Sequence, residues 1–407
     1  MKVRRGYKTE LDPNNIQRTL LLKHAGAARF AYNWGLARKI AAYKLGEKVP
    51  SAIDLHRELN ALKSTAYPWM YEVSKCAPQE ALRDLDRAYA NFFRKVKLKK
   101  QGKHKGKLGF PKFKKKSRAI GSFRLTGTIK IFGGSVQLPR LGRMRLKERG
   151  YLPLEAKILS ATVSEQAGSW YVSIQVEEEQ PDPIAPTGDP IGVDLGIKTL
   201  ATCSDGTTYE NPRALKHHLK KLKRLECQKS RRKKGSKNRI KTCKAIAKVH
   251  QRIANIRKDA AHKLTSSLCK NHAEVAIEDL CVRGMVKNHH LAQAISDSNF
   301  GEIRRQLKYK AAWCGVQIVT VNRYYPSSKT CSSCGWINED LMLADRLFIC
   351  KACGLIIDRD LNAAINLRNE ALQTTASSAE SDACGVGGAG LSATTSETAH
   401  GETRTKR

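Results

Sequence analysis

Apolar residues recur at helical spacing in the first quarter of the chain, and residues 13 to about 100 are therefore predicted to be helical. One apolar face repeats at alternating steps of three and four residues: Ala81, Leu85, Ala88, Phe92 and Val96. Pro78 is suited to the first position of that helix, where a missing N–H leaves no hydrogen bond unmade. We expect this face to lie in a hydrophobic core.

From about residue 121 to 178 the apolar period changes to two, which predicts strands with one buried face. The alternating positions are Ile129, Ile131, Val136, Leu138, Trp170, Val172, Ile174 and Val176. Gly133-Gly134 and Ala167-Gly168 are suited to turns between paired strands. We expect a small antiparallel barrel or sheet, and the proline-rich segment at 181–190 marks the end of this domain.

Strand and helix signals alternate in the third region, which predicts an α/β domain. The strand segments read IGVDLGI, TLATCSDG, EVAIEDL and VQIVTV, the second returning as a hairpin after the first, and helices are expected at about 212–272 and 297–314. Apolar positions on one face of the last helix are expected to cover the sheet: Phe300, Ile303, Leu307 and Cys314. From about Gln373 onward small and polar residues dominate, which favours a disordered tail.

Composition narrows the possible partners. At 407 residues the chain is long enough for two or three cores, and its hydrophobic fraction of 41% can fill them. Lysine and arginine number 74 against 37 acidic residues, and the net charge of +37 far exceeds what solubility requires. A polyanion is the expected partner, and because the charge runs along most of the chain, nucleic acid is favoured over a membrane surface.

The sequence predicts neither a membrane-spanning helix nor a secretory signal. No segment approaches the roughly 18 apolar residues that a membrane-spanning helix needs. The beginning, MKVRRGYKTELD, has basic residues but no apolar stretch after them, so no secretory signal is predicted. We therefore expect an intracellular protein without a membrane partner.

Seven cysteines before residue 320 are scattered singly and are expected to be core thiols in a reducing compartment: Cys76, Cys203, Cys227, Cys243, Cys269, Cys281 and Cys314. Four others form two CxxC pairs with fifteen residues between them, the spacing of a structural zinc site: Cys331, Cys334, Cys350 and Cys353. Gly335 and Gly354 follow the two pairs and allow the backbone to curl around the metal. Four sulfur ligands leave no open position for water, so this Zn2+ is expected to be structural. Unligated thiols and redox pairs are the alternatives, and two correctly spaced pairs disfavour both.

Three acidic residues lie where a sheet would present them together: Asp194, Glu278 and Asp360. A charge inside an apolar strand pattern is costly unless it is paired or bound to metal. Such carboxylates can hold two Mg2+ ions about 4 Å apart, as two-metal hydrolysis of a phosphodiester requires. Taken singly, a strand-end acid is more often solvated, and Asp360 could cap the helix that follows it.

These segments, in this order, resemble the OrfB/TnpB proteins of bacterial and archaeal insertion sequences, which are regarded as ancestors of type V CRISPR effector nucleases. The likeness is carried by GVDLGIKTLAT, AIEDL, the CSSCG and CKACG pairs and DRDLNAAINL. RFAYNWGL near the start and GFPKFKKKSR before the predicted barrel extend it to about residues 1–370. As an ordered set these motifs are specific to the family, although no single one is.

The resemblance implies a multidomain α+β protein with these parts: a helical recognition domain at 13–118, a wedge β-barrel at 1–12 and 119–184, an RNase H-like (RuvC) α/β nuclease domain at 185–328 and 355–372, an inserted zinc ribbon at 329–354, and a tail at 373–407. It implies RNA-guided cleavage of double-stranded DNA next to a short transposon-adjacent motif, in the cytoplasm or nucleoid of a prokaryotic cell. The implied cofactors are two Mg2+ ions, a structural Zn2+ and a guide RNA. Whether one or two copies act together is left open.

On the family pattern Asp194, Glu278 and Asp360 match the catalytic triad that binds Mg2+. Asp279 and Asp358 are alternatives within the same motifs. Because neighbouring side chains on a strand point to opposite faces, both members of a pair are not expected to reach the metals.

Two basic segments are candidates for nucleic-acid binding. From Lys95 to Arg118 cations interleave with Phe110 and Phe113, and from Lys216 to Lys241 the only acidic residue is Glu226. The residues predicted to contact nucleic acid are Lys112, Lys114, Lys115, Lys116, Arg231, Arg232, Lys233 and Lys234. A solvated linker and a solvent-facing helical hairpin are the alternatives. Beside a nuclease core, the second segment would instead line a channel for an RNA–DNA heteroduplex.

Three other functions fit parts of these patterns. A DNA transposase would use the same RNase H-like fold for strand transfer. A nuclease-inactive, RNA-guided repressor would not need the three acids, and their retention disfavours it. A zinc-dependent DNA-binding protein without catalysis would show sequence preference without RNA.

Overall fold

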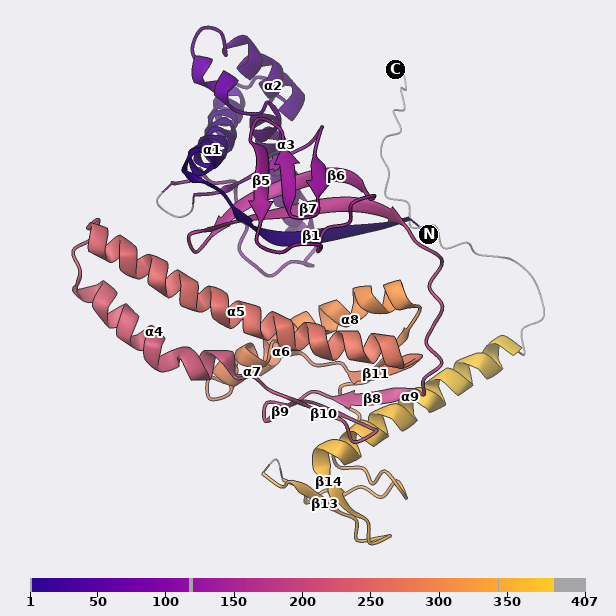
Figure 1. Ribbon diagram of the computed structural model, residues 1–407. Coiled ribbons are helices and arrows are strands. Elements are labelled where there is room, and N and C mark those ends of the chain that lie inside the picture. The colour runs from indigo at the N-terminus through magenta and orange to yellow at the C-terminus, as the bar shows by residue number, and fades with distance from the viewer. Residues whose placement is uncertain (1, 117–119, 343, 384–407) are drawn as a thin grey trace. The chain divides into compact units, whose positions relative to one another are not determined.

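The computed structural model describes residues 2–116, 120–342 and 344–383, with side chains up to residue 375 (Figure 1). The chain divides into two compact units, Met1–Asp182 with Leu215–Asn255 and Pro183–Ala214 with Ile256–Arg407. The boundary after Asp182 falls in the proline-rich segment. Residues 117 and 118 of the first basic segment and residues 384–407 of the predicted tail lie outside the described residues.

Helices occupy residues 15–100 of the first unit, as predicted: α1 (Asn15–Lys44), α2 (Ala52–Ala61), the short 3-10 helix η1 (Pro68–Glu72) and α3 (Cys76–Lys100). α1 and α2 each begin with a capping box, which satisfies backbone N–H groups that a first turn leaves unpaired. α3 begins two residues before Pro78, so this proline lies inside the first turn. The predicted apolar face is buried at Ala81 and Leu85 and becomes partly exposed toward the end of the helix.

Seven strands form one antiparallel sheet in this unit, in the order β2-β6-β7-β1-β5-β4-β3. They are β1 (Lys2–Asp12), β2 (Ser122–Leu125), β3 (Lys130–Phe132), β4 (Ser135–Leu138), β5 (Gly142–Leu146), β6 (Lys157–Gln166) and β7 (Ser169–Glu179). The predicted turns are confirmed, since Gly133-Gly134 joins β3 to β4 and Ala167-Gly168 joins β6 to β7. Within the described residues β2 and β3 do not pair, so the sheet is open and no closed barrel is formed. Both edge strands are short, at four and three residues, so few backbone hydrogen bonds could form between them to close a barrel.

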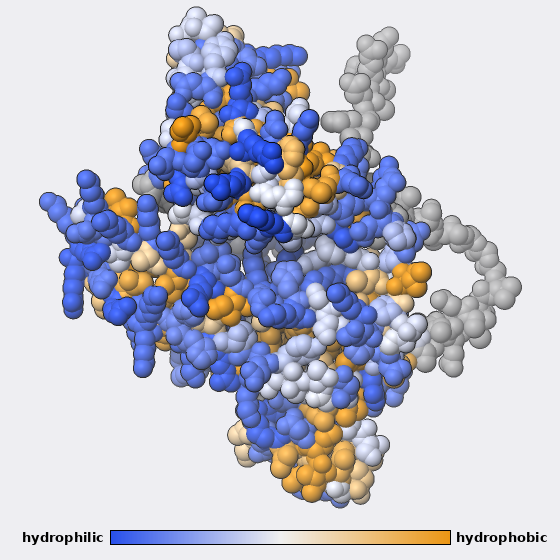
Figure 2. Space-filling view, in the orientation of Figure 1, coloured by the Kyte–Doolittle hydropathy of each residue, from blue (hydrophilic) through white to orange (hydrophobic). Residues whose placement is uncertain are grey.

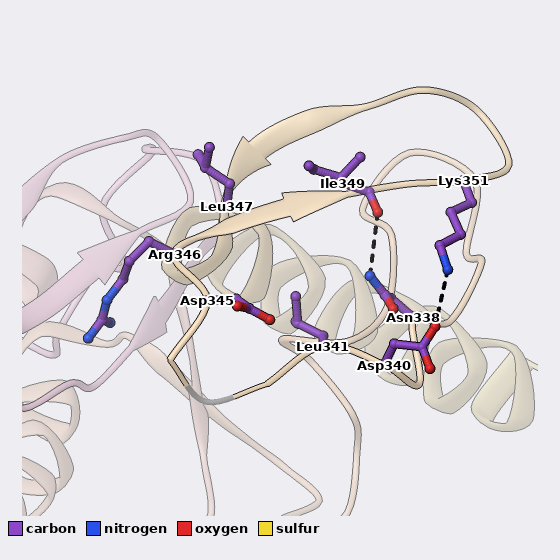
Figure 3. A pocket seen from close by; sticks show the side chains of 8 residues that line it. All are labelled: Asn338, Asp340, Leu341, Asp345, Arg346, Leu347, Ile349 and Lys351. Atoms are coloured by element: carbon purple, nitrogen blue, oxygen red, sulfur yellow. Dashed lines mark hydrogen bonds and ion pairs between the residues drawn. The ribbon is translucent and has the colours of Figure 1, made fainter.

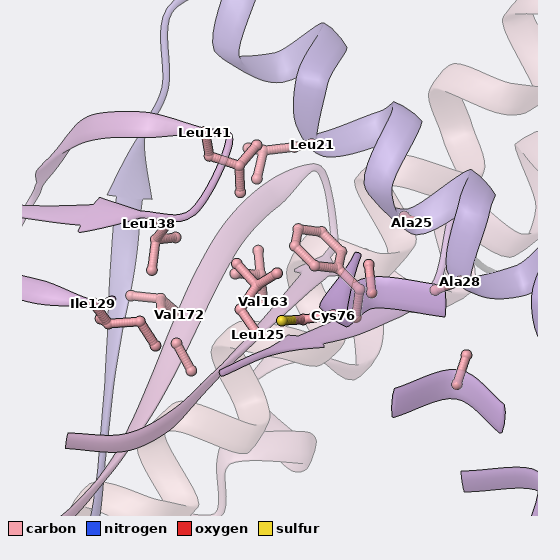
Figure 4. Packing of buried hydrophobic residues seen from close by; sticks show 14 of the residues in the cluster. Leu21, Ala25, Ala28, Cys76, Leu125, Ile129, Leu138, Leu141, Val163 and Val172 are labelled. Carbon is pink, nitrogen blue, oxygen red and sulfur yellow. The ribbon is translucent and has the colours of Figure 1, made fainter. Parts of the chain in front are cut away.

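One hydrophobic cluster joins the helices to this sheet (Figure 4). The predicted inward positions of β7 are all buried: Trp170, Val172, Ile174 and Val176. They belong to the same cluster as Leu21 and Ala28 of α1 and Leu85 of α3. The helices therefore use the sheet as one wall of their core.

A helical hairpin, α4 (Ala214–Arg231) and α5 (Lys237–Asn271), occupies the second basic segment. Arg239 donates to the carbonyl oxygens of Lys229 and Arg232, which satisfies acceptors that the end of α4 leaves unpaired. Arg232 in turn donates to the carbonyl oxygen of Asn238 across the loop. Although α5 has 35 residues, neither it nor any other helix in the described part of the chain is long and apolar enough to cross a bilayer.

The second unit contains a five-stranded sheet in the order β10-β9-β8-β11-β12. The strands are β8 (Ile191–Asp194), β9 (Thr199–Cys203), β10 (Thr208–Glu210), β11 (Glu274–Glu278) and β12 (Gln317–Val321), which include all four predicted segments. β8, β11 and β12 are parallel, and β9 returns antiparallel to β8 as the predicted hairpin. Strands and helices alternate, so the α/β prediction for this region is confirmed.

Three helices connect β11 to β12: α6 (Val282–Met285), α7 (Ala292–Ser298) and α8 (Phe300–Cys314). The helix predicted from about residue 297 to Cys314 is confirmed as α8, although it begins slightly later, because Asn299 adopts a left-handed conformation (φ 60°) that separates it from α7. Phe300, Ile303 and Leu307 are buried in the cluster that covers the sheet, as predicted.

The two faces of this sheet are covered by different helices. Ile191, Val193, Val275 and Ile277 share a hydrophobic cluster with residues of α5 and α8. α9 (Arg359–Ala383) lies on the other face and packs mainly against β8. Because side chains alternate along a strand, the residues at 192, 194, 276 and 278 point to the α9 side.

A two-stranded sheet, β13 (Leu347–Ile349) and β14 (Ile356–Asp358), lies between β12 and α9 in the chain. Phe348 is fully buried there beside Cys331 and Cys350. α9 extends to Ala383, so the predicted disorder is wrong for residues 373–383. This stretch continues a helix that is already nucleated against the sheet, so it can extend without a strong helix propensity of its own.

The seven single cysteines do not share one environment. Cys76, Cys203 and Cys269 are buried, as predicted, and Cys314 is partly buried. Cys227, Cys243 and Cys281 are exposed, so the prediction that they are core thiols is wrong. The first two lie on the basic hairpin, whose amphipathic helices turn a wide polar face to solvent.

Candidate active site

Two of the candidate carboxylates end neighbouring parallel strands. β8 pairs with β11 in a register that places Val193 opposite Ile277, so Asp194 and Glu278 are the next pair along. Neighbouring strands are about 4.8 Å apart, and both side chains point to the α9 face. The sheet alone therefore sets these two carboxylates side by side.

Asp360 reaches the same edge because α9 approaches β8 very closely. Gly192 permits this approach, since a Cβ there would lie 2.0 Å from the carbonyl oxygen of Ala364 and 2.6 Å from the backbone nitrogen of Arg368. Asp360 is about one helical turn before Ala364, and Asp194 is two residues after Gly192. The contact thus sets the first turn of α9 beside the end of β8.

Gly192 was not among the residues predicted from the sequence. A glycine inside a strand pattern often marks a site where another backbone comes close, and this signal was present in IGVDLGI. Its role depends on packing against a helix that begins far along the chain. The sequence could have indicated the close approach but not its partner.

The carboxylates at this edge repel one another. Burial raises the pKa of Asp194 to about 7, and the neighbouring carboxylates of Asp360 and Glu278 act in the same direction. Arg359 opposes this shift, and its guanidinium pairs with the Asp360 carboxylate at 3.1 Å. Burial also raises the pKa of Glu278, with a second contribution from Asp279. One arginine beside three acids leaves an excess of negative charge that a divalent cation would neutralise.

The donor set fits Mg2+, which prefers carboxylate oxygen ligands. In the described part of the chain, only the four cysteines form a group of three or more potential ligands whose atoms all lie within 4.8 Å of one another.

The two alternative acids have partners of their own. Asp279 forms ion pairs with Arg304 and Arg323, so both of its oxygens have partners. One Asp358 oxygen accepts hydrogen bonds from the backbone nitrogens of residues 360 and 361, at 2.9 and 3.1 Å. Asp358, and not Asp360, therefore caps α9, and Asp360 is left to face Asp194.

The four predicted zinc ligands come together. Their sulfur atoms all lie within 4.8 Å of one another, with 3.7 Å between Cys331 and Cys353 and 3.5 Å between Cys334 and Cys350. Both knuckles have the same backbone geometry, in which the glycine after the second cysteine has a positive φ and donates to the carbonyl oxygen of the first. Four thiols at this spacing fit a tetrahedral Zn2+.

Two buried asparagines tie this ribbon to α9. Asn362 accepts from the backbone nitrogen of Ser332 at 3.0 Å and donates to the carbonyl oxygen of Thr330 at 2.7 Å. Asn366, one turn further along, donates to the carbonyl oxygens of Ser327 and Thr330. These residues were also missed, although polar side chains at i and i+4 in the otherwise apolar LNAAINL are the signal that could have identified them. The zinc knuckle is thereby coupled to the helix that carries Asp360.

The outer surface of the ribbon is apolar. Figure 2 shows hydrophobic side chains gathered over it, and the exposed ones are Ile337, Met342, Leu347, Ile349 and Ile356. An open depression of about 590 Å³ is lined in part by Leu341 and Leu347, with the ion pair of Lys351 and Asp340 at its edge (Figure 3). Asp194, Glu278 and Asp360 do not line it, so this depression is separate from the candidate active site.

Seven of the eight cations predicted to contact nucleic acid are exposed: Lys112, Lys114, Lys115, Lys116, Arg231, Lys233 and Lys234. The ammonium group of Lys114 lies over the Tyr32 ring, 3.9 Å from its centre, and burial lowers the pKa of this lysine. Arg232 contributes to the hairpin loop through Asn238 and Thr242. These two side chains therefore have structural contacts within the protein, whatever else they bind.

Three family models match this chain. "OrfB_IS605: Probable transposase" matches residues 173–289, "Cas12f1-like, TNB domain" matches residues 300–367, and the helix-turn-helix model of the same OrfB group matches residues 1–48. The matched segments include β8, β11, the four cysteines and the first turn of α9.

Relatives match over nearly the whole chain. The protein named "Putative RNA-guided DNA endonuclease InsQ" from Escherichia coli K12 is 34% identical over 385 residues, which cover 90% of this chain and 92% of that protein. A "Putative RNA-guided DNA endonuclease" from Streptomyces pristinaespiralis is also 34% identical, covering 92% and 91%. Among solved structures, the "Cas12f1-sgRNA-target DNA complex" aligns with a TM-score of 0.54 at 12% identity, over 90% of this chain and 99% of that one. This last likeness shows a shared mixed α+β fold of the Cas12 type.

Proposed function

Since this chain belongs to the OrfB/TnpB family, we propose that it is an RNA-guided DNA endonuclease of a transposon. The observation that carries this proposal is the meeting of three acids from separate parts of the chain at one edge of the β8–β11–β12 sheet. A repressor that only binds DNA has no need of this costly concentration of negative charge.

Asp194, Glu278 and Asp360 would hold the Mg2+ ions. When bound, Mg2+ supplies the activation of water and the stabilisation of the leaving oxygen that phosphodiester hydrolysis needs. Burial and the neighbouring carboxylates of Asp360 and Glu278 raise the pKa of Asp194 to about 7, so Asp194 would lose a proton when cations bind. Arg359 holds the Asp360 carboxylate in place at the start of α9.

The basic surfaces would hold the nucleic acids. An RNA–DNA heteroduplex is gripped mainly through its backbone, and the exposed cations at the tip of the α4–α5 hairpin suit this contact: Arg231, Lys233 and Lys234. Lys112, Lys115 and Lys116 offer a second row in the first unit. A steep loss of binding between low and moderate salt is expected, and a flat dependence would count against these contacts.

A groove in the first unit would read the short duplex motif next to the target. Its volume is about 910 Å³, and it lies between η1, the start of α3 and the loops of the sheet. The lining combines cations with amide and hydroxyl groups: Lys63, Lys75, Gln79, Thr126, Gln137 and Arg140. Cations can bind the two backbones while amide and hydroxyl groups reach base edges.

The domain assignments implied by the family remain part of this proposal. The recognition domain, the wedge domain, the RuvC-like nuclease and the zinc ribbon keep the boundaries given above. The compartment that supplies both guide RNA and target DNA is the prokaryotic cytoplasm or nucleoid.

The test is cleavage by protein purified together with RNA from cells that carry its native locus. Target DNA matching that RNA should be cut when Mg2+ is present, and Asp194→Ala should lower the rate about a thousandfold or more while RNA remains bound. Asp259→Ala, which removes an exposed acid of α5, is the matched control and should cut normally. Unchanged cleavage by a folded, RNA-bound Asp194→Ala protein would refute the nuclease assignment.

A DNA transposase is the second candidate, because the model that matches residues 173–289 is described as a probable transposase. The same carboxylates would then support strand transfer. Products in which a donor end is joined to target DNA would favour it. Simple cut DNA that appears only with matching RNA would exclude it.

A further inference from the structure

A second polar cluster lies at the same edge of the sheet as the carboxylates. Asp279 directly follows Glu278, and by strand alternation its side chain points to the opposite, α8 side. There Arg304 of α8 donates to one Asp279 oxygen at 2.6 Å, and Arg323, which follows β12, donates to the other through Nε at 3.2 Å and through Nη2. One carboxylate therefore fixes two guanidinium groups from different elements.

The cluster has a surplus of positive charge. Arg304 and Arg323 both pair with the single carboxylate of Asp279, so two guanidinium groups share one acid and the trio carries one net positive charge. The side chains of Arg304 and Arg323 keep 35% and 41% of their surface exposed. A guanidinium has five N–H donors, so a single shared carboxylate leaves each arginine with donors for a further acceptor.

An exposed aromatic ring follows directly in the chain. Tyr324 is 85% exposed, which is unusual for so large an apolar surface unless it serves a contact. Its backbone is held in a turn, because Asn322 accepts from the nitrogens of Tyr324 at 2.9 Å and of Tyr325 at 3.0 Å. A fixed guanidinium beside an open ring is the combination that binds a nucleotide, with the phosphate on one and the base on the other.

We propose that Arg304, Arg323 and Tyr324 form a nucleotide-binding subsite for the DNA strand that enters the active site. The two arginines bind a phosphate that flanks the scissile one, and the Tyr324 ring stacks on the adjoining base. The subsite lies across the sheet edge from Asp194, so it positions the strand and does not touch the reacting phosphate. This inference rests on the proposed nuclease function.

The phosphate contact is tested with target DNA that carries one neutral methylphosphonate at a time on either side of the cut. The wild-type protein with its RNA should be slowed about tenfold at one flanking linkage. Arg323→Ala should be about tenfold slower on ordinary DNA and should show no further slowing at that linkage, because the charge has already lost its partner. Arg87→Ala, which removes another exposed and ion-paired arginine, should respond to every linkage as the wild type does.

If Arg323→Ala and a methylphosphonate lower the rate independently at every linkage, so that the two losses multiply, the phosphate contact would be overturned. The arginines would then be only a structural bridge. Arg323→Lys keeps the charge and should regain part of the rate, which separates this contact from a folding defect in Arg323→Ala. A wild-type protein that cuts no DNA would refute the nuclease proposal and this one together. A wild-type protein that cuts DNA, together with independent losses from Arg323→Ala and from each methylphosphonate, would refute the subsite alone.

The base contact is tested at the nucleotide next to the same linkage. Tyr324→Ala should cut about tenfold more slowly, and an abasic site at that nucleotide should slow the wild type but not this variant. Tyr324→Phe should regain most of the rate that Tyr324→Ala loses, because stacking needs the ring and not the hydroxyl. Tyr43→Ala removes an equally open ring from α1 and serves as the control. A Tyr324→Ala protein with the wild-type rate, or a Phe variant as slow as the Ala variant, would overturn the stacking contact.

Discussion

The zinc ribbon and the carboxylate site are built in opposite ways. The ribbon takes its four candidate ligands from residues 331–353, where each CxxC turn presents two thiols, and sulfur atoms of the two turns lie 3.7 and 3.5 Å apart. The carboxylates are spread from residue 194 to residue 360 and meet only through strand register and one helix contact. Burial and mutual repulsion raise the pKa of Asp194 to about 7, so the second site is held together against its own charge.

This difference predicts different sensitivities. The ribbon should depend on its cysteines and its metal, because its geometry is local. The carboxylate site should depend as much on residues that touch no carboxylate, because β8, β11 and α9 must all be in place. Changes that move α9 should therefore abolish cleavage without removing zinc.

Among changes that leave the three carboxylates in place, the largest effect is expected from Gly192→Val. The new side chain would overlap the α9 backbone at Ala364 and Arg368, so the helix and Asp360 must shift. We expect cleavage to fall about a hundredfold or more and the free energy of unfolding to fall by about 3 kcal/mol, with zinc content unchanged. Gly301→Ala is the control, since its Cβ would meet nothing within 4 Å, and it should cut normally. Wild-type cleavage by Gly192→Val would show that the close approach is dispensable.

Loss of zinc should have the next largest effect. Cys350→Ser removes a buried ligand, and we expect the bound zinc to be lost and cleavage to fall at least about tenfold as the ribbon loosens from α9. Metal content and cleavage rate measure the two effects. Cys243→Ser, at an exposed position of α5, should retain both. Full cleavage by a zinc-free protein would separate the ribbon from catalysis.

A smaller effect is expected where the two sites are joined. Asn362→Ala leaves the Ser332 nitrogen and the Thr330 carbonyl oxygen without this partner, which should cost about 1–3 kcal/mol of unfolding free energy. We expect zinc to remain bound while cleavage falls several-fold. Asn369→Ala on the same helix should change neither the unfolding free energy nor the cleavage rate, because the Asn369 side chain accepts from the neighbouring Arg368 and does not contact the ribbon in this way. Zinc loss in the Asn362 variant would mean that the ribbon is less independent than its local geometry implies.

The smallest effect is a gain in stability from Asp194→Asn in protein without Mg2+. The unfolded carboxyl group titrates near 3.8 and the folded one near 7, so the folded state binds the extra proton between these values and stability declines as pH rises through them. The asparagine removes this cost, and at pH 8 the metal-free variant should be more stable by about 1–2 kcal/mol after allowance for solvent screening. Denaturation curves at pH 5 and pH 8, with and without Mg2+, measure the difference. An equal gain at pH 5, or one that persists in Mg2+, would contradict this origin.

The difference between local and long-range geometry also determines which features could be predicted from the sequence. The zinc cysteines were predictable because two CxxC turns fix their geometry locally. The positions of Asp194 and Glu278 at strand ends followed from apolar runs that stop at an acid, and the structure sets both residues at such ends. The choice between neighbouring acids needed the fold, since the partners of Asp279 lie on α8 and after β12.

Long-range packing was beyond the sequence. The role of Gly192 depends on its packing against Ala364, and the role of Asn362 depends on its hydrogen bond with the backbone of the first zinc knuckle. The sheet of the first unit is open and does not close into the predicted barrel, and the predicted disorder of 373–383 is wrong. Both differences have a related reason. Whether a sheet closes or a helix continues depends on what neighbours it, and local composition does not record that.

The proposed cleavage depends most on Asp194, Glu278 and Asp360, which would hold the ions at which DNA is cut. Anomalous diffraction from crystals of the RNA-bound protein containing Mn2+ in place of Mg2+ tests this most directly. We predict two peaks about 4 Å apart in contact with these three carboxylates, and no such pair in Asp194→Asn. Peaks at other residues, or none in a protein that still cuts DNA, would contradict the claim.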